Sequence, residues 1–146
     1  MARRIIHATD FSTEAKAAEA EAVRLARALD AELILLHVAS EAPLYREAPF
    51  GMGRVKNVYE AQARWAEETL AARARFLATQ GVPTGWRRRV GHPHEEIVKA
   101  ARKEGAAYIV MGTHGRGALG RFMLGSVADR VMRMAPCPVL TVRPPS

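Results

Sequence analysis

The chain has 146 residues, 49% of them hydrophobic, and a formal net charge of +7. This length and composition predict a single globular domain over residues 1–146 and exclude an intrinsically disordered chain. The apolar runs fall well short of the roughly 20 residues that cross a bilayer, and the first residues lack a signal-peptide pattern. We therefore expect a cytoplasmic protein with no membrane association, and its single cysteine, Cys137, fits a reducing compartment.

The basic balance raises the question of nucleic-acid binding, because a basic surface attracts phosphate backbones. The arginines are spread along the chain, however, and the tightest run is Arg87, Arg88 and Arg89. This run lies in a strand-like segment, where positive charge serves equally well to protect an edge strand from further pairing. We do not expect specific binding of DNA or RNA.

The amino-terminal part predicts a strand, a helix and a second strand. A short strand over residues 3–8 leads into a helix that Ser12 or Thr13 can cap, and alanines and leucines at spacings of three and four give this helix a core-facing stripe. Residues 33–38 are continuously apolar apart from His37, as is typical of a parallel strand covered on both faces. We expect His37 to be a hydrogen-bonded core residue rather than a ligand.

The segment that follows is less regular. Prolines and glycines interrupt any period over residues 40–56, which predicts a loop. A long helix then runs to about Gln80, and we expect Trp65 and Phe76 to widen its apolar face.

Three further strands alternate with two helices in the second half of the chain, and they span residues 86–90, 108–111 and 139–142. Pro93 and two glutamates mark the start of the first of these helices, and Gly105 marks its end. The last helix begins at Ser126, with Asp129 placed for a capping box.

Five strands alternating with four helices predict an α/β fold with an open, mainly parallel sheet and helices on both faces, because parallel neighbours need helical crossovers. With strands two and three on one side of the first strand, and four and five on the other, the strand order is 3-2-1-4-5. The winding then reverses between strands one and four, and ligands of such sheets bind outside the carboxyl ends at that point. This topology brings Asp10, after strand one, close to Gly112, at the end of strand four.

Five glycines punctuate the segment between the fourth strand and the last helix, at Gly112, Gly115, Gly117, Gly120 and Gly125. Glycines let a backbone approach a ligand closely, and a helix that starts after them points free N–H groups and a positive dipole end toward the loop. Arg116 and Arg121 add positive charge. We predict an anion site for the phosphates of a nucleotide, and a plain flexible connection is the open alternative.

Individual side chains suit parts of such a site. Asp10 can accept hydrogen bonds from ribose hydroxyls or reach a Mg2+ ion that bridges the phosphates, Ser126 can donate to a phosphate oxygen, and Arg116 can neutralise one. The structural alternatives stay open: Asp10 as no more than a cap at the helix entry, and His114 as a loop residue with no ligand contact.

Catalytic and metal-binding patterns are weaker. His92, His94 and His114 have no further ligand at a recognisable spacing, so we predict no metal site built from protein side chains. We predict no catalytic residue either, because none is evidently placed to activate water.

Four motifs carry a resemblance to a known family. The spacing G-x2-G-x9-G-S of Gly112, Gly115, Gly125 and Ser126 resembles the ATP-binding signature of the universal stress protein family. The D-F-S after the first strand, the L-L-H-V of the second and the closing P-C-P-V-L-T-V-R extend the resemblance over essentially the whole chain. It implies an adenine nucleotide alpha hydrolase-like fold.

The resemblance also implies a set of contacts with ATP or another adenine nucleotide, together with Mg2+. The aspartate after the first strand, Asp10, would contact the nucleoside, with backbone contacts from Thr9, and Val38 at the end of the second strand would help to enclose the adenine. The ribose and phosphates would be held by Met111, Gly112, His114, Gly115, Arg116, Gly125, Ser126, Val127 and Ala128.

A homodimer is expected as well, because the last strand would leave an apolar edge that pairing with a twofold-related copy would cover. The residues of that strand are Val139, Leu140, Thr141 and Val142. We predict an ATP-binding stress protein that acts as a nucleotide-responsive binding module, with weak or no hydrolysis. The alternatives are a scaffold that acts by protein contacts without nucleotide and an enzyme that transfers an adenylyl group.

Overall fold

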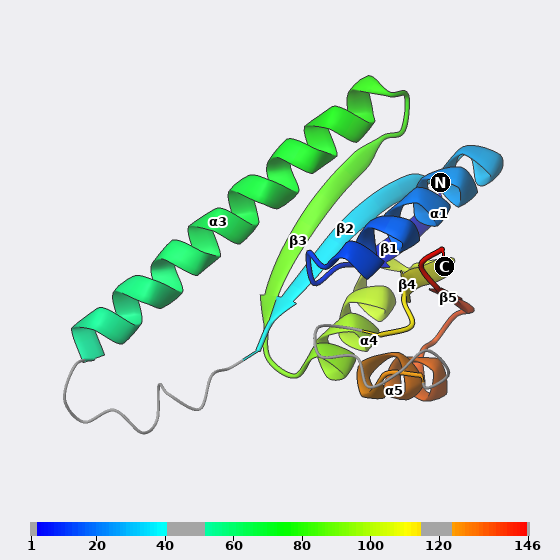
Figure 1. Ribbon diagram of the computed structural model, residues 1–146. Coiled ribbons are helices and arrows are strands. Elements are labelled where there is room, and N and C mark those ends of the chain that lie inside the picture. Colours follow the sequence, from blue (N-terminus) through cyan, green and yellow to red (C-terminus); the bar gives the residue numbers. More distant parts are fainter. Residues whose placement is uncertain (1–2, 41–51, 115–123, 146) are drawn as a thin grey trace.

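The computed structural model describes residues 3–40, 52–114 and 124–145 and shows strands and helices in regular alternation (Figure 1). The strands are β1 (Arg4–Ala8), β2 (Glu32–Ala39), β3 (Thr84–Val90), β4 (Tyr108–Gly112) and β5 (Val139–Val142). The helices are α1 (Thr13–Leu29), α3 (Met52–Thr79), α4 (Pro93–Glu104) and α5 (Ser126–Met134). In these parts of the chain the predicted alternation of five strands with four helices is confirmed.

The five strands form one parallel sheet in the order β3-β2-β1-β4-β5, as predicted. Strand β1 is the centre of the sheet, because Ile6 lies opposite Ile34 of β2 on one side and Ile109 of β4 on the other. The reversal of winding therefore falls between β1 and β4.

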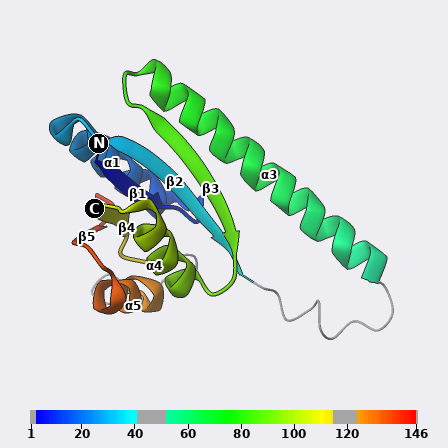
Figure 2. The ribbon, with the colours of Figure 1, turned by 180° about the vertical axis from the view of Figure 1, so that it is seen from behind.

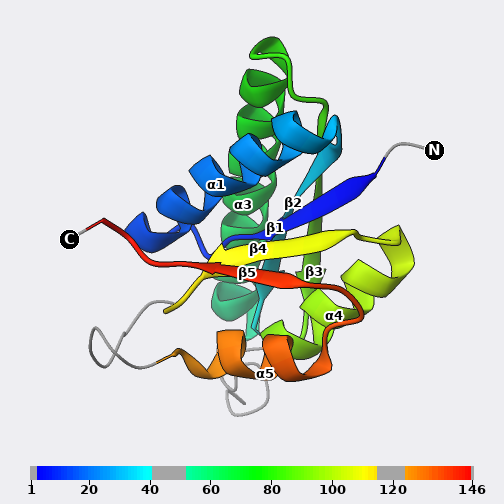
Figure 3. The same cartoon turned by 90° about the vertical axis from the view of Figure 1, so that its right-hand side faces the viewer.

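Helices cover both faces of the sheet (Figure 3). Helices α1 and α3 pack on one face and α4 and α5 on the other, so that the sheet lies between two separate apolar cores. Successive residues of β1 enter opposite cores, since Ile5 packs beneath α1 and α3 while Ile6 packs beneath α4 and α5. Burial on both sides explains why the centres of β1, β2 and β4 are apolar without alternation.

Local sequence signals set most helix boundaries. Ser12 caps α1, with its Oγ accepting a hydrogen bond from the Ala15 N–H at 3.2 Å. Helix α4 has Pro93 in its first turn and stops at Gly105, whose φ of 60° is readily adopted by glycine.

Two expectations about α3 are wrong. The helix begins at Met52, inside the segment predicted to be a loop, because one glycine costs a helix only about 1 kcal/mol and a long helix can carry it. The rest of that predicted loop, beyond Ser40, lies outside the described residues. Trp65 and Phe76 are 53% and 48% exposed rather than core-facing, since each precedes a buried position by one residue, about 100° around the helix. The buried face of α3 is formed by Ala66, Leu70, Ala74 and Leu77.

No described helix, α3 included, is both long and apolar enough to cross a membrane.

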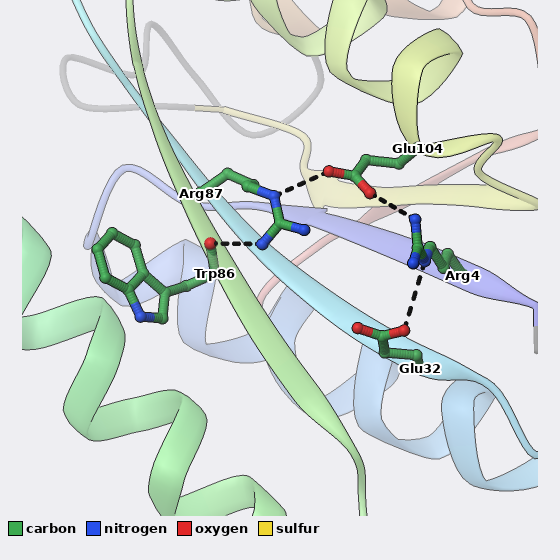
Figure 4. A network of polar contacts seen from close by, with 5 residues as sticks. All are labelled: Arg4, Glu32, Trp86, Arg87 and Glu104. Atoms are coloured by element: carbon green, nitrogen blue, oxygen red, sulfur yellow. Dashed lines mark hydrogen bonds and ion pairs between the residues drawn. The ribbon is translucent and has the colours of Figure 1, made fainter.

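Ion pairs tie the edge strand β3 to α4 and β1 (Figure 4). The Glu104 side chain is only 7% exposed and accepts hydrogen bonds from Arg4 and from Arg87, each at 2.8 Å. Arg89 donates to Glu96 at 3.1 Å. Arginines of the basic run therefore lie on an edge strand and pair with carboxylates of the chain itself.

One histidine lies entirely inside the core. His7 of β1 is 1% exposed, and its Nδ1–H donates to the Val110 carbonyl at 3.1 Å, while its Nε2 has no hydrogen-bond partner in the described part of the chain. Burial lowers the pKa of His7 below its ordinary value, and this effect outweighs the hydrogen bond to Val110 and the nearby charges of Glu19 and Asp10.

Replacing Glu104 with alanine should lower the free energy of unfolding by about 1–3 kcal/mol, because two guanidinium groups lose a shared and largely buried acceptor. Urea unfolding measures this change. Glu68→Ala, at an exposed position of α3, is the control and should stay within about 0.5 kcal/mol of the wild type. Equal stability of the two variants would show that the network adds nothing to the fold.

The depressed pKa of His7 predicts acid-sensitive stability. The unfolded chain binds a proton at His7 more readily than the folded chain does, so the stability due to the neutral ring is present above pH 6.5 and is lost as the pH falls below it. The urea midpoint of His7→Leu should change less with pH than that of the wild type between pH 7.5 and about pH 5. The contribution of His7 to the free energy of unfolding changes by at most about 1.4 kcal/mol per pH unit. The exposed His92→Gln should keep the wild-type slope, and an unchanged slope in His7→Leu would contradict the assignment.

Candidate functional site

The carboxyl ends of β1 and β4 are neighbours at one edge of the sheet. The register pairs His7 with Val110, and the chain then leaves β1 through Thr9 and Asp10 and leaves β4 through Thr113 and His114. From β1 the chain passes to α1 on one face of the sheet, and α5 lies on the opposite face. The two chain segments thus diverge at the predicted switch point.

A tight turn joins β1 to α1. The Phe11 N–H donates to Thr9 Oγ1 at 3.0 Å, and the Ser12 N–H donates to Asp10 Oδ1 at 2.9 Å. Asp10 therefore has the structural role that was left open, since its carboxylate helps to build the helix entry, although the cap of α1 itself is Ser12. This role does not remove Asp10 from the edge.

Phe11 occupies an unusual conformation in this turn. Its φ is 63°, in the left-handed region, which costs a non-glycine residue on the order of 1–2 kcal/mol. Its ring lies 4.4 Å from the His37 ring and 4.9 Å from the Trp65 ring, measured between centroids. The sequence did not single out Phe11 as a site residue, because a left-handed turn is usually signalled by glycine or asparagine.

Strand β2 contributes His37 and Val38 to the same edge. The His37 Nδ1–H donates to the Thr9 carbonyl at 2.8 Å, so the predicted hydrogen bond of this histidine is confirmed, although the residue is half-buried at the edge and not in the core. Val38 is half-buried and packs at the margin of the core beneath α4 and α5.

The exit from β4 is closely packed against α1. A Cβ added to Gly112 would lie 3.4 Å from the His114 carbonyl oxygen and 3.7 Å from Glu14. Glu14 Oε2 and His114 Nε2 are both buried and have no hydrogen-bond partner among the residues that the structure describes. Two polar groups at this edge are therefore unsatisfied, which favours a site for a polar ligand or water. The sequence did not predict Glu14 as a site residue, and its position in the first turn of α1 was the one available signal.

Helix α5 starts at this edge with a free amino-terminal end. The Gly125 N–H donates to the Thr113 carbonyl at 2.7 Å, which brings the start of α5 back to the end of β4. Gly125 is the N-cap and no side chain caps the helix, so the predicted capping box is wrong. The Asp129 carboxylate pairs instead with Arg133 at 3.2 Å, because a capping box needs a hydroxyl at the N-cap.

The predicted site residues differ in what they present at the edge. Met111 and Ala128 are buried in the core beneath α4 and α5, so they can offer a ligand only backbone groups. Ser126 is exposed and Val127 is half-buried in the first turn of α5. Gly115 and Arg116, and with them Gly117, Gly120 and Arg121, lie outside the described residues. Among the described residues no three His, Cys, Asp or Glu side chains gather into a set that could hold a metal ion.

Residues 1–143 match the sequence model of the Universal stress protein family. The chain belongs to the universal stress protein family. A universal stress protein of Thermus aquaticus is 40% identical over 144 residues, which cover 98% of this chain and 100% of that protein. The family predicted from the glycine spacing and the flanking motifs is thus confirmed.

Solved structures of universal stress proteins share the fold. The universal stress protein UspA from Lactobacillus plantarum matches with a TM-score of 0.81 at 26% identity, over 97% of each chain. A universal stress protein crystallised in complex with cAMP matches with a TM-score of 0.62 at 26% identity, over 96% of this chain and 95% of that one. Some structural neighbours of this universal stress protein therefore bind an adenine nucleotide.

Proposed function

We propose that this universal stress protein binds ATP or another adenine nucleotide, with Mg2+, and acts as a nucleotide-responsive binding module. The observation that carries the proposal is the hydrogen bond from Gly125 to Thr113, which returns the uncapped start of α5 to the carboxyl end of β4. Free N–H groups and the positive end of the helix dipole favour a phosphate there.

The other contacts are those that the family resemblance implies, and Gly115 and Arg116 among them lie outside the described residues. Asp10 would accept hydrogen bonds from the ribose or contact Mg2+, Thr9 would contribute backbone contacts, and Val38 would help to enclose the base. The phosphates would meet the first turn of α5 and the chain that leaves β4, and the proposed residues are Met111, Gly112, His114, Gly115, Arg116, Gly125, Ser126, Val127 and Ala128. Bound Mg2+ would neutralise phosphate charge, which the nearby carboxylates of Asp10 and Glu14 would otherwise oppose.

Weak or absent hydrolysis is part of the proposal. The proposed contacts hold the phosphates, and none of them gives a residue the role of orienting or activating an attacking water. The response to nucleotide would then lie in what the bound protein recruits, in the cytoplasm as the sequence predicts.

A homodimer through β5 is a separate proposal. Strand β5 is the second edge of the sheet, and Leu140 on it is 40% exposed. Pairing of Val139, Leu140, Thr141 and Val142 with the same strand of a second copy would satisfy this edge.

Calorimetric titration of ATP with Mg2+ should show saturable binding, and Gly125→Val should weaken it by about tenfold or more, because the valine side chain would stand in front of the first-turn N–H groups. The φ of −62° and ψ of 153° at Gly125 are accessible to valine, so strain would not cause the loss. His92→Val is the matched control, since His92 is the uncapped N-cap of α4, with φ of −77° and ψ of 122°, and should bind normally.

The same titration separates the alternatives. A well-folded wild type that binds no nucleotide would favour the nucleotide-independent scaffold. Accumulation of AMP or pyrophosphate on incubation with ATP would favour an enzyme that transfers an adenylyl group.

Light scattering at micromolar concentration should give the mass of a dimer, and Leu140→Lys should shift it toward the monomer, because a lysine on an edge strand opposes pairing. Val90→Lys is the control, at a position that is 50% exposed on the opposite edge strand β3, and should leave the mass unchanged. A monomeric wild type would rule out the proposed assembly.

A further inference from the structure

An aromatic contact joins the candidate site to the longest helix of the protein. The Phe11 ring lies between His37 of β2 and Trp65 of α3, tilted against the first and edge-on to the second at an interplanar angle of 75°. The Phe11–Trp65 contact links α3 directly to the turn that carries Asp10.

The rest of the attachment of α3 lies elsewhere. Its buried face packs on β2 and β3 through residues such as Leu70 and Leu77, in the carboxyl-terminal half of the helix. Figures 1 and 2 show its amino-terminal end standing away from the strands at the carboxyl edge of the sheet. Trp65 therefore lies at the start of the firmly packed part of α3, one residue before Ala66, the first buried residue among the described side chains of the helix.

The turn itself depends on side-chain contacts for its shape. Phe11 is held in the left-handed region, which its own backbone disfavours, and the hydrogen bonds of residues 9–12 are formed around that conformation. A strained residue persists where its surroundings over-determine it, and here the surroundings include the His37 and Trp65 rings. Loss of the Trp65 ring would loosen the turn and with it the direction of the Asp10 carboxylate.

We propose that Trp65 is a positioning residue for the nucleotide site, and that binding at Asp10 is coupled to α3 through Phe11. This inference rests on the proposed function. If the Trp65–Phe11 contact favours the conformation that binds the ligand, the bound ligand strengthens the contact by the same factor, because coupling between sites is reciprocal.

The coupling predicts where nucleotide binding would change the surface of the protein, namely on the exposed side of α3. Val58, Trp65 and Phe76 are 48% to 56% exposed and lie on one side of α3, since their spacings of 7 and 11 residues are close to whole numbers of turns. A change in the packing of Trp65 would alter this exposed side directly, more than 50 residues along the chain from Asp10.

The two tryptophans of the chain allow a direct test. In a Trp86→Phe background, Trp65 is the sole tryptophan. Its emission should change on titration with ATP and Mg2+, and the change should be half complete at a free nucleotide concentration equal to the dissociation constant measured by calorimetry. In the wild-type background, Trp65→Leu should weaken nucleotide binding by about tenfold, and Trp65→Phe should restore most of it.

Phe76→Leu is the matched control, because Phe76 is an aromatic residue of the same helix with nearly the same exposure but stacks on Arg73 at 4.8 Å instead of on Phe11. It should bind nucleotide like the wild type, and thermal unfolding would confirm that all variants are folded. Unchanged Trp65 emission together with unchanged affinity in Trp65→Leu would overturn the inference while leaving nucleotide binding intact. Absence of binding in the wild type and in the Trp86→Phe protein would overturn the proposed function, and the inference with it.

Discussion

The parallel pairing of β1 with β4 is the constraint on which the rest of the structure depends. These strands are neighbours in space but are separated in the chain by two strands and three helices. Crossovers from β1 run on one side toward β2 and β3, and the chain must then return to place β4 on the other side. Because α1 and α5 consequently lie on opposite faces, the carboxyl ends of β1 and β4 lie between the first turn of α1, which packs against Gly112, and the start of α5, which is bonded to Thr113. The place where the topology reverses is thereby the place where polar groups remain available to a ligand.

Both cores contribute to holding this reversal in place. Ile5 and Ile6 belong to different cores, so that the central strand is fixed from both faces, and the hydrogen bond from His7 to Val110 adds a polar tie across the β1–β4 boundary. At the edge of the sheet, ion pairs add to apolar burial. Arg87 and Arg89 of β3 pair with Glu104 and Glu96 of α4. The apolar centre sets the topology, and the ion pairs position an edge strand whose outer side lacks a neighbouring strand.

The fold was accessible from the sequence because its signals are local. Continuous apolar runs, the Ser12 cap and the Gly105 stop are each recognised within a few residues, and right-handed crossovers leave few layouts for five strands.

The features that the sequence did not predict depend on contacts between residues far apart in the chain. Whether Trp65 is buried depends on which side of α3 meets β2 and β3, and a one-residue offset of about 100° decides it. Among the described residues, Glu14 Oε2 has no hydrogen-bond partner where α1 packs beside Gly112, and no spacing in the sequence predicts this packing. At the site, the sequence placed Asp10 and Gly125 at the correct edge but could not give the conformation of the turn between Asp10 and Ser12.

That turn illustrates how a site and a fold can share one interaction. A glycine at position 11 would adopt a φ of 63° without strain, and the entry to α1 would then need no aromatic ring. With phenylalanine, the backbone cost is offset by the hydrogen bonds to Thr9 Oγ1 and Asp10 Oδ1 and by the contacts of the ring, which include His37 of β2 and Trp65 of α3. The conformation of residues 9–12 therefore depends in part on the position of α3, whereas a glycine turn would not need the aromatic contacts. Binding of any ligand that contacts the Asp10 carboxylate therefore depends on the packing of α3 as well. Helix α3 influences the geometry of the candidate site although it does not itself reach the switch point between β1 and β4.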